Sequence, residues 1–103
     1  MTLTELSRLL EDMNIPIHYS HTRDKVKAPY LVYYELFTET FKADNKVLSK
    51  AKRIQVELYT KEKDEQLELK LETLFDDNSL PYDIDYLYID GENVFQTSYE
   101  ITI

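Results

Sequence analysis

Two β-rich runs joined by a charged segment without glycine constrain this chain more than any other feature of its sequence. The runs are Ala28–Leu36 and Arg53–Tyr59, and the connection carries the polar tip Phe41–Asn45. Dense aromatic and β-branched side chains favour strands over helices. We therefore predict a hairpin-like unit whose polar connection, over residues 39–50, is a long loop.

The alternation of side chains distinguishes the two predicted strands. In the first, over residues 30–40, both faces are largely apolar or aromatic, which is typical of a central strand. We expect a helix to cover one of its faces and a partner the other. In the second, over residues 51–60, Ile54, Val56 and Leu58 point to one face and mainly polar residues to the other.

One amphipathic helix is predicted before these strands and one after them. Thr2 caps the first helix, Glu5 completes a capping box, and Pro16 follows its end. The second is predicted to begin at Thr60 and to end at Asp76–Asn78. Apolar residues recur at helical spacing along one face of each. They are Leu3, Leu6, Leu9, Leu10 and Met13 in the first helix, and Leu67, Leu71, Leu74 and Phe75 in the second, with Leu69 off the stripe.

The remaining segments complete an α+β domain. A short strand is predicted over Ile17–Ser20, then a basic loop over residues 21–29, and finally strands over Tyr82–Ile89 and Val94–Ile103. The order is α-β-β-β-α-β-β, with two helices packed on one face of a mainly antiparallel sheet of about four to five strands. Residues 1–103 are too few for two cores, so we predict a single domain.

Composition narrows the class of protein. The chain has nine Tyr and no Cys, which excludes disulfides and cysteine-based zinc sites. The N-terminus has no basic region followed by an apolar run, and no apolar stretch approaches the ~20 residues that span a bilayer. We expect a soluble cytoplasmic protein without a membrane partner.

Charge is distributed unevenly along the chain. The net charge is −8, yet residues 1–60 hold nine Lys/Arg against eight Asp/Glu, whereas residues 61–103 hold three against twelve. An acidic surface repels phosphate, which disfavours non-specific binding to DNA. The acidic C-terminal part is expected to be a solvated face that aids solubility, or alternatively the working surface of a regulator.

Neither catalysis nor cofactor binding is indicated. His18 and His21 would point to opposite faces of an extended segment, which disfavours a shared metal. No glycine-rich phosphate loop or hydrolase motif is present, so we expect no enzyme activity, no cofactor and no catalytic residue. Asp83, Asp85 and Asp90 do not match the EF-hand spacing, although a weak cation site there stays an alternative.

The connection between the strands concentrates basic residues near an aromatic one. Stacking on nucleic acid needs exposed aromatics beside the charge, and Glu39 and Asp44 interrupt the basic run. We therefore predict contact with protein and no specific nucleic acid, with a merely solvated connection as the alternative. The basic residues are Lys42, Lys46, Lys50, Lys52 and Arg53.

In their order along the chain, these features resemble a family of small structural proteins encoded by long-tailed bacteriophages and by prophages of Gram-positive bacteria. The matching parts cover most of the chain. They are the opening helix with Leu6, Leu9 and Leu10, the strand Pro29–Tyr33, the loop Phe41–Asn45 and the strand-to-helix passage Val56–Asp64.

The resemblance implies a non-enzymatic virion protein that completes or terminates the tail and helps to join it to the head. Such proteins look like compact α+β domains that assemble as homo-oligomeric rings at the head-proximal end of the tail, with a hexamer as the candidate here. The implied partners are other copies of the chain, the tail tube protein and the head-completion or connector proteins. The implied location is the virion, at the tail or the head–tail junction, after assembly in the host cytoplasm.

A ring requires two different contact surfaces on every subunit. We predict that one is an assembly loop with Phe41 as its apolar anchor, which reaches a neighbouring subunit or the tail tube. Lys42, Asp44 and Asn45 surround that anchor.

The second contact surface is predicted on an edge strand at the end of the chain. This strand, Val94–Ile103, would offer Tyr99, Ile101 and Ile103 to a neighbour. Three alternatives to the tail-completion role stay open, namely a head-side adaptor, a minor tail protein and a small acidic regulator that binds a host protein.

Overall fold

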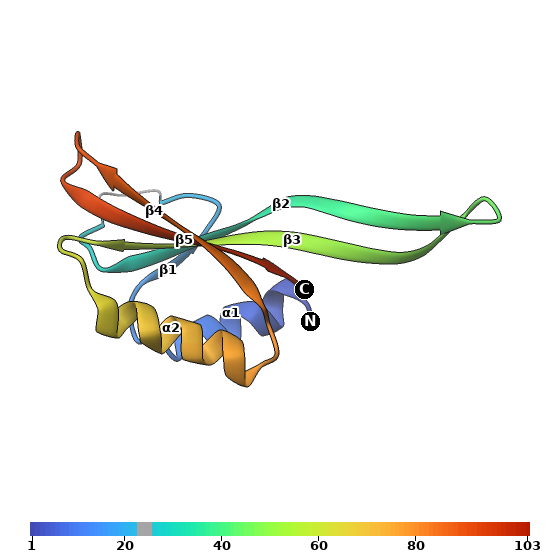
Figure 1. Ribbon diagram of the computed structural model, residues 1–103, viewed down its shortest axis with the longest axis horizontal. Helices are drawn as coiled ribbons and strands as arrows, with labels where there is room; N and C mark the ends of the chain where they lie inside the picture. Colours follow the sequence, from blue (N-terminus) through green and yellow to red (C-terminus); the bar gives the residue numbers. More distant parts are fainter. Residues whose placement is uncertain (23–25) are drawn as a thin grey trace.

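The structure is a computed structural model that describes residues 1–22 and 26–103 (Figure 1). Its elements follow the predicted order α-β-β-β-α-β-β, which confirms the α+β class. The predicted basic loop over residues 21–29 includes residues 23–25, which lie outside the described residues. The elements are α1 (Leu3–Glu11), β1 (Ile17–Tyr19), β2 (Tyr30–Ala43), β3 (Lys46–Thr60), α2 (Glu65–Asp77), β4 (Tyr82–Ile89) and β5 (Val94–Thr102).

The strands form one five-stranded sheet in the order β1-β2-β3-β5-β4. β1 runs parallel to β2, and the other neighbours are antiparallel. Both helices lie on the same face of this sheet, as predicted (Figure 1). Because β1 has only three residues, β4 is the longer of the two outer strands.

The core lies between the helices and the sheet. Leu6 and Leu10 of α1 and Leu71 and Phe75 of α2 are completely buried against the sheet. Each such side chain contributes about 1.5–3 kcal/mol through removal from water. The predicted apolar stripes therefore face the core. Their partners in the sheet are Leu31, Tyr33, Ile54, Val56, Leu58, Tyr99 and Ile101.

Of the two predicted helix starts, the first is confirmed and the second is wrong. Thr2 and Glu5 form the predicted capping box at α1. The predicted start of the second helix at Thr60 is wrong, because Thr60 is the buried last residue of β3. Instead Asp64 is the N-cap, and its carboxylate accepts a hydrogen bond of 3.0 Å from the backbone N–H of Leu67.

The long loop predicted over residues 39–50 is also wrong, because β2 and β3 continue as a paired ladder to Ala43 and Lys46. Only Asp44 and Asn45 form the turn, with φ of 51° and 61°. Positive φ at both central residues is the geometry of a type I′ turn, whose twist matches that of the flanking strands. Asp and Asn tolerate this region better than most residues.

The outer part of this hairpin projects from the body of the molecule, and we call residues 37–52 the arm. β5 pairs with β3 from Arg53 to Thr60, Ile103 bonds the backbone of Lys52 at the base of the arm, and β1 pairs with β2 only from Leu31 to Tyr33. The molecule is therefore elongated, with extents of 51 × 28 × 22 Å. The arm forms one end of the long axis, at the right of Figure 1, away from the start of α2 and the end of β4.

Candidate assembly surfaces

The arm presents two chemically different faces. Alternation and cross-strand register place Phe37, Glu39 and Phe41 on one face, where Glu39 forms an ion pair with Arg53 at 3.5 Å. The other face carries Thr38, Thr40, Lys50 and Lys52. The arm thus combines an aromatic face with a basic one.

Exposed apolar residues collect toward the end of the arm. Phe41 is 54% exposed and Leu48 is 68% exposed, with Val47 between Leu48 and the turn. A shift in strand register between Phe41 and Lys42 leaves Leu48 as the extra residue on β3. Four lysines against Glu39 and Asp44 make the arm basic, although the chain carries a net charge of −8.

The predicted assembly residues Phe41, Lys42, Asp44 and Asn45 all lie at the end of the arm and are exposed. Asp44 and Asn45 make the turn, while Phe41 and Lys42 precede it on β2. The sequence prediction overlooked the apolar residues of the returning strand. Two adjacent apolar residues at positions 47 and 48, within a polar segment, were the available signal.

The predicted second interface on Val94–Ile103 is contradicted by the sheet order. β5 lies between β3 and β4, so it has no free edge over its paired length. Tyr99 and Ile101 are buried in the core, and Ile103 packs beside it, half-buried. The alternation of β5 correctly indicated a buried face, but that face contacts the helices and not a neighbouring molecule.

The edge strand beside β5 is β4, and it carries exposed apolar residues. Tyr86, Leu87 and Tyr88 are each more than two-fifths exposed. Edge strands with unpaired backbone groups are sites where another chain can add. The exposed edge that the sequence predicted on β5 is therefore found on the neighbouring strand β4.

A cleft of about 770 Å³ lies between the first half of α2 and strands β4 and β5. We call it the α2–β4 cleft. Its apolar lining includes Leu69, which is 63% exposed, and the Tyr86 ring, which is 56% exposed. Leu87 pairs with Gln96 and borders the cleft from the opposite face of the sheet. The full lining is Lys63, Glu65, Glu68, Leu69, Glu72, Tyr86, Leu87, Tyr88, Phe95, Gln96 and Thr97.

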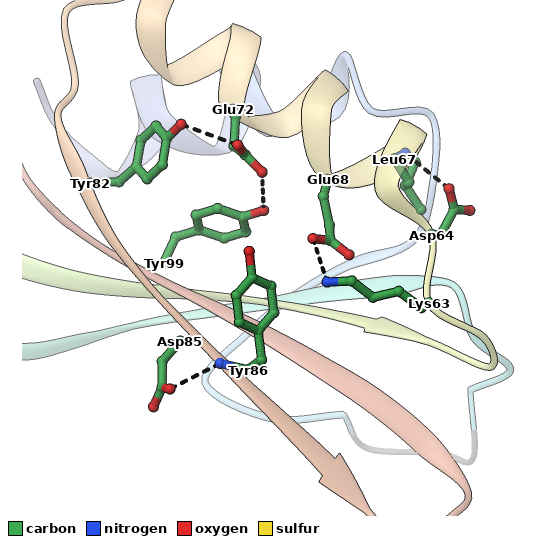
Figure 2. Close-up of polar contacts among 9 residues, drawn as sticks. All are labelled: Lys63, Asp64, Leu67, Glu68, Glu72, Tyr82, Asp85, Tyr86 and Tyr99. Atoms are coloured by element: carbon green, nitrogen blue, oxygen red, sulfur yellow. Dashed lines mark hydrogen bonds and ion pairs between the residues drawn. The ribbon is translucent and has the colours of Figure 1, made fainter.

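One wall of the cleft is organised by an ion pair. Lys63 Nζ donates to Glu68 Oε1 at 2.9 Å and lies 3.9 Å from the centre of the Tyr86 ring (Figure 2). Desolvation lowers the pKa of Lys63, but the hydrogen bond and charge of Glu68 outweigh it and raise that pKa overall. Lys63 thus neutralises Glu68 and leaves Glu65 and Glu72 as further acidic groups of the lining.

Glu72 of the cleft lining is hydrogen-bonded to two tyrosines at the core. Its carboxylate accepts hydrogen bonds from the hydroxyls of Tyr99 at 2.8 Å and Tyr82 at 3.2 Å (Figure 2). Burial first, and then Glu72, raises the pKa of Tyr99 above its usual range. Both tyrosines therefore stay protonated and act as donors at neutral pH.

The sheet face away from the helices carries a polar network centred on a buried carboxylate. Glu57 is only 7% exposed and accepts hydrogen bonds from Tyr34, Gln55 and Tyr59 at 3.2, 2.8 and 3.0 Å. Gln96 in turn donates to the Tyr59 hydroxyl at 2.7 Å. Three donors satisfy the carboxylate, so this network is a closed structural unit.

The other predicted polar sites stay apart from one another. The His18 ring packs edge-on against Tyr30, whereas His21 is exposed beside Ser20. Asp83 and Asp85 are exposed on β4, and Asp85 accepts from the backbone N–H of Tyr86 at 2.9 Å. In residues 1–22 and 26–103, no three His, Asp or Glu side chains gather as a metal-binding group would.

Comparisons with known proteins assign no family to this chain. No protein-family model matches the sequence, and no curated protein matches it either. Across the part of the chain that the structure describes, no helix has the length and apolar character needed to cross a membrane. The arm and the α2–β4 cleft are therefore the surfaces of this molecule that bear on its function.

Proposed function

We propose that this protein is a non-enzymatic structural subunit of a larger assembly and that its arm is a contact element. The arm carries the proposal because it holds exposed apolar side chains beyond the paired body of the sheet. Phe41 and Leu48 are not among the core residues, so they contribute little to the packing of the body. Contiguous exposed apolar surface on a soluble protein marks interaction sites.

The placement of the apolar surfaces favours a ring over a symmetric dimer. The arm and β4 are chemically different surfaces on different parts of the molecule. Heterologous contacts between two different surfaces generate rings when the rotation closes, whereas a two-fold dimer uses one surface twice. A homo-oligomeric ring, with a hexamer as the candidate, is the assembly we propose.

Within that class, we propose tail completion at the head–tail junction of a long-tailed bacteriophage, on the strength of the sequence resemblance described above. The proposed partners are the tail tube protein and the head-completion or connector proteins, and the proposed location is the virion. The arm supports this role because a projecting hairpin reaches a neighbour without any rearrangement of the core.

The association of the purified chain tests the assembly role. We expect the wild-type protein to show a mass that rises with concentration to a defined multiple of 12.3 kDa in light scattering. Phe41→Asp places a charge on the aromatic face and should give a monomer with an unchanged thermal midpoint. Thr40→Asp adds the same charge to the opposite face and is the matched control. A wild-type monomer at millimolar concentration would rule out the ring.

Imaging of phage particles made without this protein tests the tail-completion role. Overlong tails are expected from loss of a terminator, and tails of normal length detached from heads are expected from loss of a joining protein. Infectious particles of normal shape would remove the virion role, even if the purified chain forms a ring.

A further inference from the structure

We infer that the α2–β4 cleft receives the arm of a second copy of this chain. This inference rests on the proposed function, because it names the surface through which an assembling subunit accepts its neighbour. Its occupant is one segment, residues 37–52 of the next copy. The arm and the cleft match in apolar character and in charge, and they lie toward opposite ends of the molecule.

The cleft and the arm match in apolar character. Leu69 and Tyr86 are each more than half exposed, and both line the cleft on the helix side of the sheet. Phe41 and Leu48 are the most exposed large apolar residues of the arm. A volume of about 770 Å³ falls in the range of pockets that enclose several side-chain-sized groups. Docking would bury four otherwise solvated side chains together.

Their charges are complementary. The arm carries Lys42, Lys46, Lys50 and Lys52 against two carboxylates, whereas the cleft carries three glutamates against Lys63. Lys63 is already paired with Glu68, so the lining has acidic groups left for incoming lysines. Complementary charge accelerates encounter and selects the partner, and added salt weakens it.

The arm of one molecule cannot reach the cleft of the same molecule. The tip of the arm lies at one end of the 51 Å axis, whereas the start of α2 and the end of β4 border the other end (Figure 1). The arm in the cleft must therefore come from another copy. Each copy then donates one arm and offers one cleft. This contact continues around a ring unless two copies exchange arms reciprocally about a two-fold axis.

Mixing two defective variants tests this inference directly. The arm variant is Phe41→Asp with Leu48→Asp, and the cleft variant is Leu69→Lys with Tyr86→Lys. All four positions are more than half exposed, so both variants should keep the fold. Each variant alone should associate about 30-fold more weakly than wild type, or not at all. An equimolar mixture should form a one-to-one heterodimer, because one intact arm meets one intact cleft.

The absence of Cys from the chain permits a second test with milder substitutions. Phe41→Cys protein mixed with Leu69→Cys protein should give a covalent dimer with a short thiol cross-linker. Thr73→Cys is the matched control, since Thr73 is exposed on α2 but does not line the cleft. Equal cross-linking at positions 69 and 73 would overturn the inference.

The outcomes separate this inference from the proposed function. Wild-type assembly without complementation between the two variants would overturn the arm–cleft contact and leave the assembly role intact. Pairing through free β4 edges would appear as loss of association in the cleft variant only. A wild-type chain that stays monomeric would overturn both.

Discussion

The arm and the body of this protein differ in how their side chains are packed. In the body, buried side chains such as Phe75 and Tyr99 touch several elements at once, and the sheet and helices depend on one another. In the arm, the two strands pair with each other, apart from backbone hydrogen bonds between Lys52 and Ile103, and they present Phe41 and Leu48 to solvent. The contrast teaches that stability and recognition are separated in space, so mutations should separate them as well.

The largest expected effect comes from a cavity in the body. Phe75 of α2 is fully buried against β4 and β5. The centre of its ring lies 5.7 Å from the centre of the Tyr82 ring and 5.6 Å from that of the Tyr99 ring. Phe75→Ala should lower the free energy of unfolding by about 3–5 kcal/mol. Phe41→Ala on the arm should change it by less than about 0.5 kcal/mol. Chemical denaturation measures both, and similar losses at both positions would break the comparison.

A smaller loss is expected at the junction of core and cleft. Tyr99→Phe removes the hydrogen bond of 2.8 Å to Glu72 and should lower the free energy of unfolding by about 1.5–3 kcal/mol at pH 7. Glu72→Gln keeps an acceptor for Tyr99 and should cost less. A Tyr99→Phe protein as stable as wild type would mean that this hydrogen bond adds nothing to the fold.

The same tyrosine makes the body sensitive to alkali. Burial, then Glu72, raises the pKa of folded Tyr99 above the unfolded value of about 10. Above pH 10 the unfolded chain therefore binds fewer protons than the folded one, and the free energy of unfolding falls as pH rises. Tyr99→Phe should flatten this fall between pH 10 and 12, as followed by denaturation at each pH. An identical pH profile in the two proteins would contradict the assignment.

Removal of the arm should change stability still less. Replacement of residues 40–50 by Asn-Gly joins Glu39 directly to its cross-strand neighbour Ala51 through a two-residue turn. The body should keep its thermal midpoint, with a change in the free energy of unfolding within about 1 kcal/mol. Light scattering should show that association is lost. A shortened chain that fails to fold would show that the arm supports the core.

The smallest effect is expected at the turn itself. Asn45 has a φ of 61°, which glycine adopts without steric cost. Asn45→Gly should leave global stability within a few tenths of a kcal/mol and slow amide exchange in residues 40–49 of the arm. Asn45→Val should speed exchange there, since β-branched residues resist positive φ. Unchanged exchange in both variants would remove the turn as a determinant of the arm.

The body could largely be predicted from the sequence, because its signals are local and periodic. The capping box at Thr2 and the leucine stripe of α1 fixed one helix, and clean alternation fixed the centre of β3. The wrong start of α2 arose because acidic residues 62 and 64 suit either a first turn or a connection. Only the pairing of Thr60 with Phe95 resolves it.

The arm and the cleft were harder to predict for physical reasons. An exposed two-stranded ladder buries neither face, so its sequence lacks the alternation that identifies a strand, and residues 39–50 resembled a loop. The exchange of β5 for β4 as the edge depends on which strands meet in space, which Tyr99 and Ile101 do not encode locally. Leu69 was recognised as off the stripe, but only the fold shows that it lines a cleft together with Tyr86.

Amide exchange measured as a function of protein concentration tests most directly whether the arm is an intermolecular element. As the chain associates, we predict that amides of residues 37–52 and of the α2–β4 cleft gain protection together. Amides in the buried part of β3, such as those of Val56 and Leu58, should keep the same protection at every concentration. An arm whose exchange does not change while light scattering reports assembly would contradict the account.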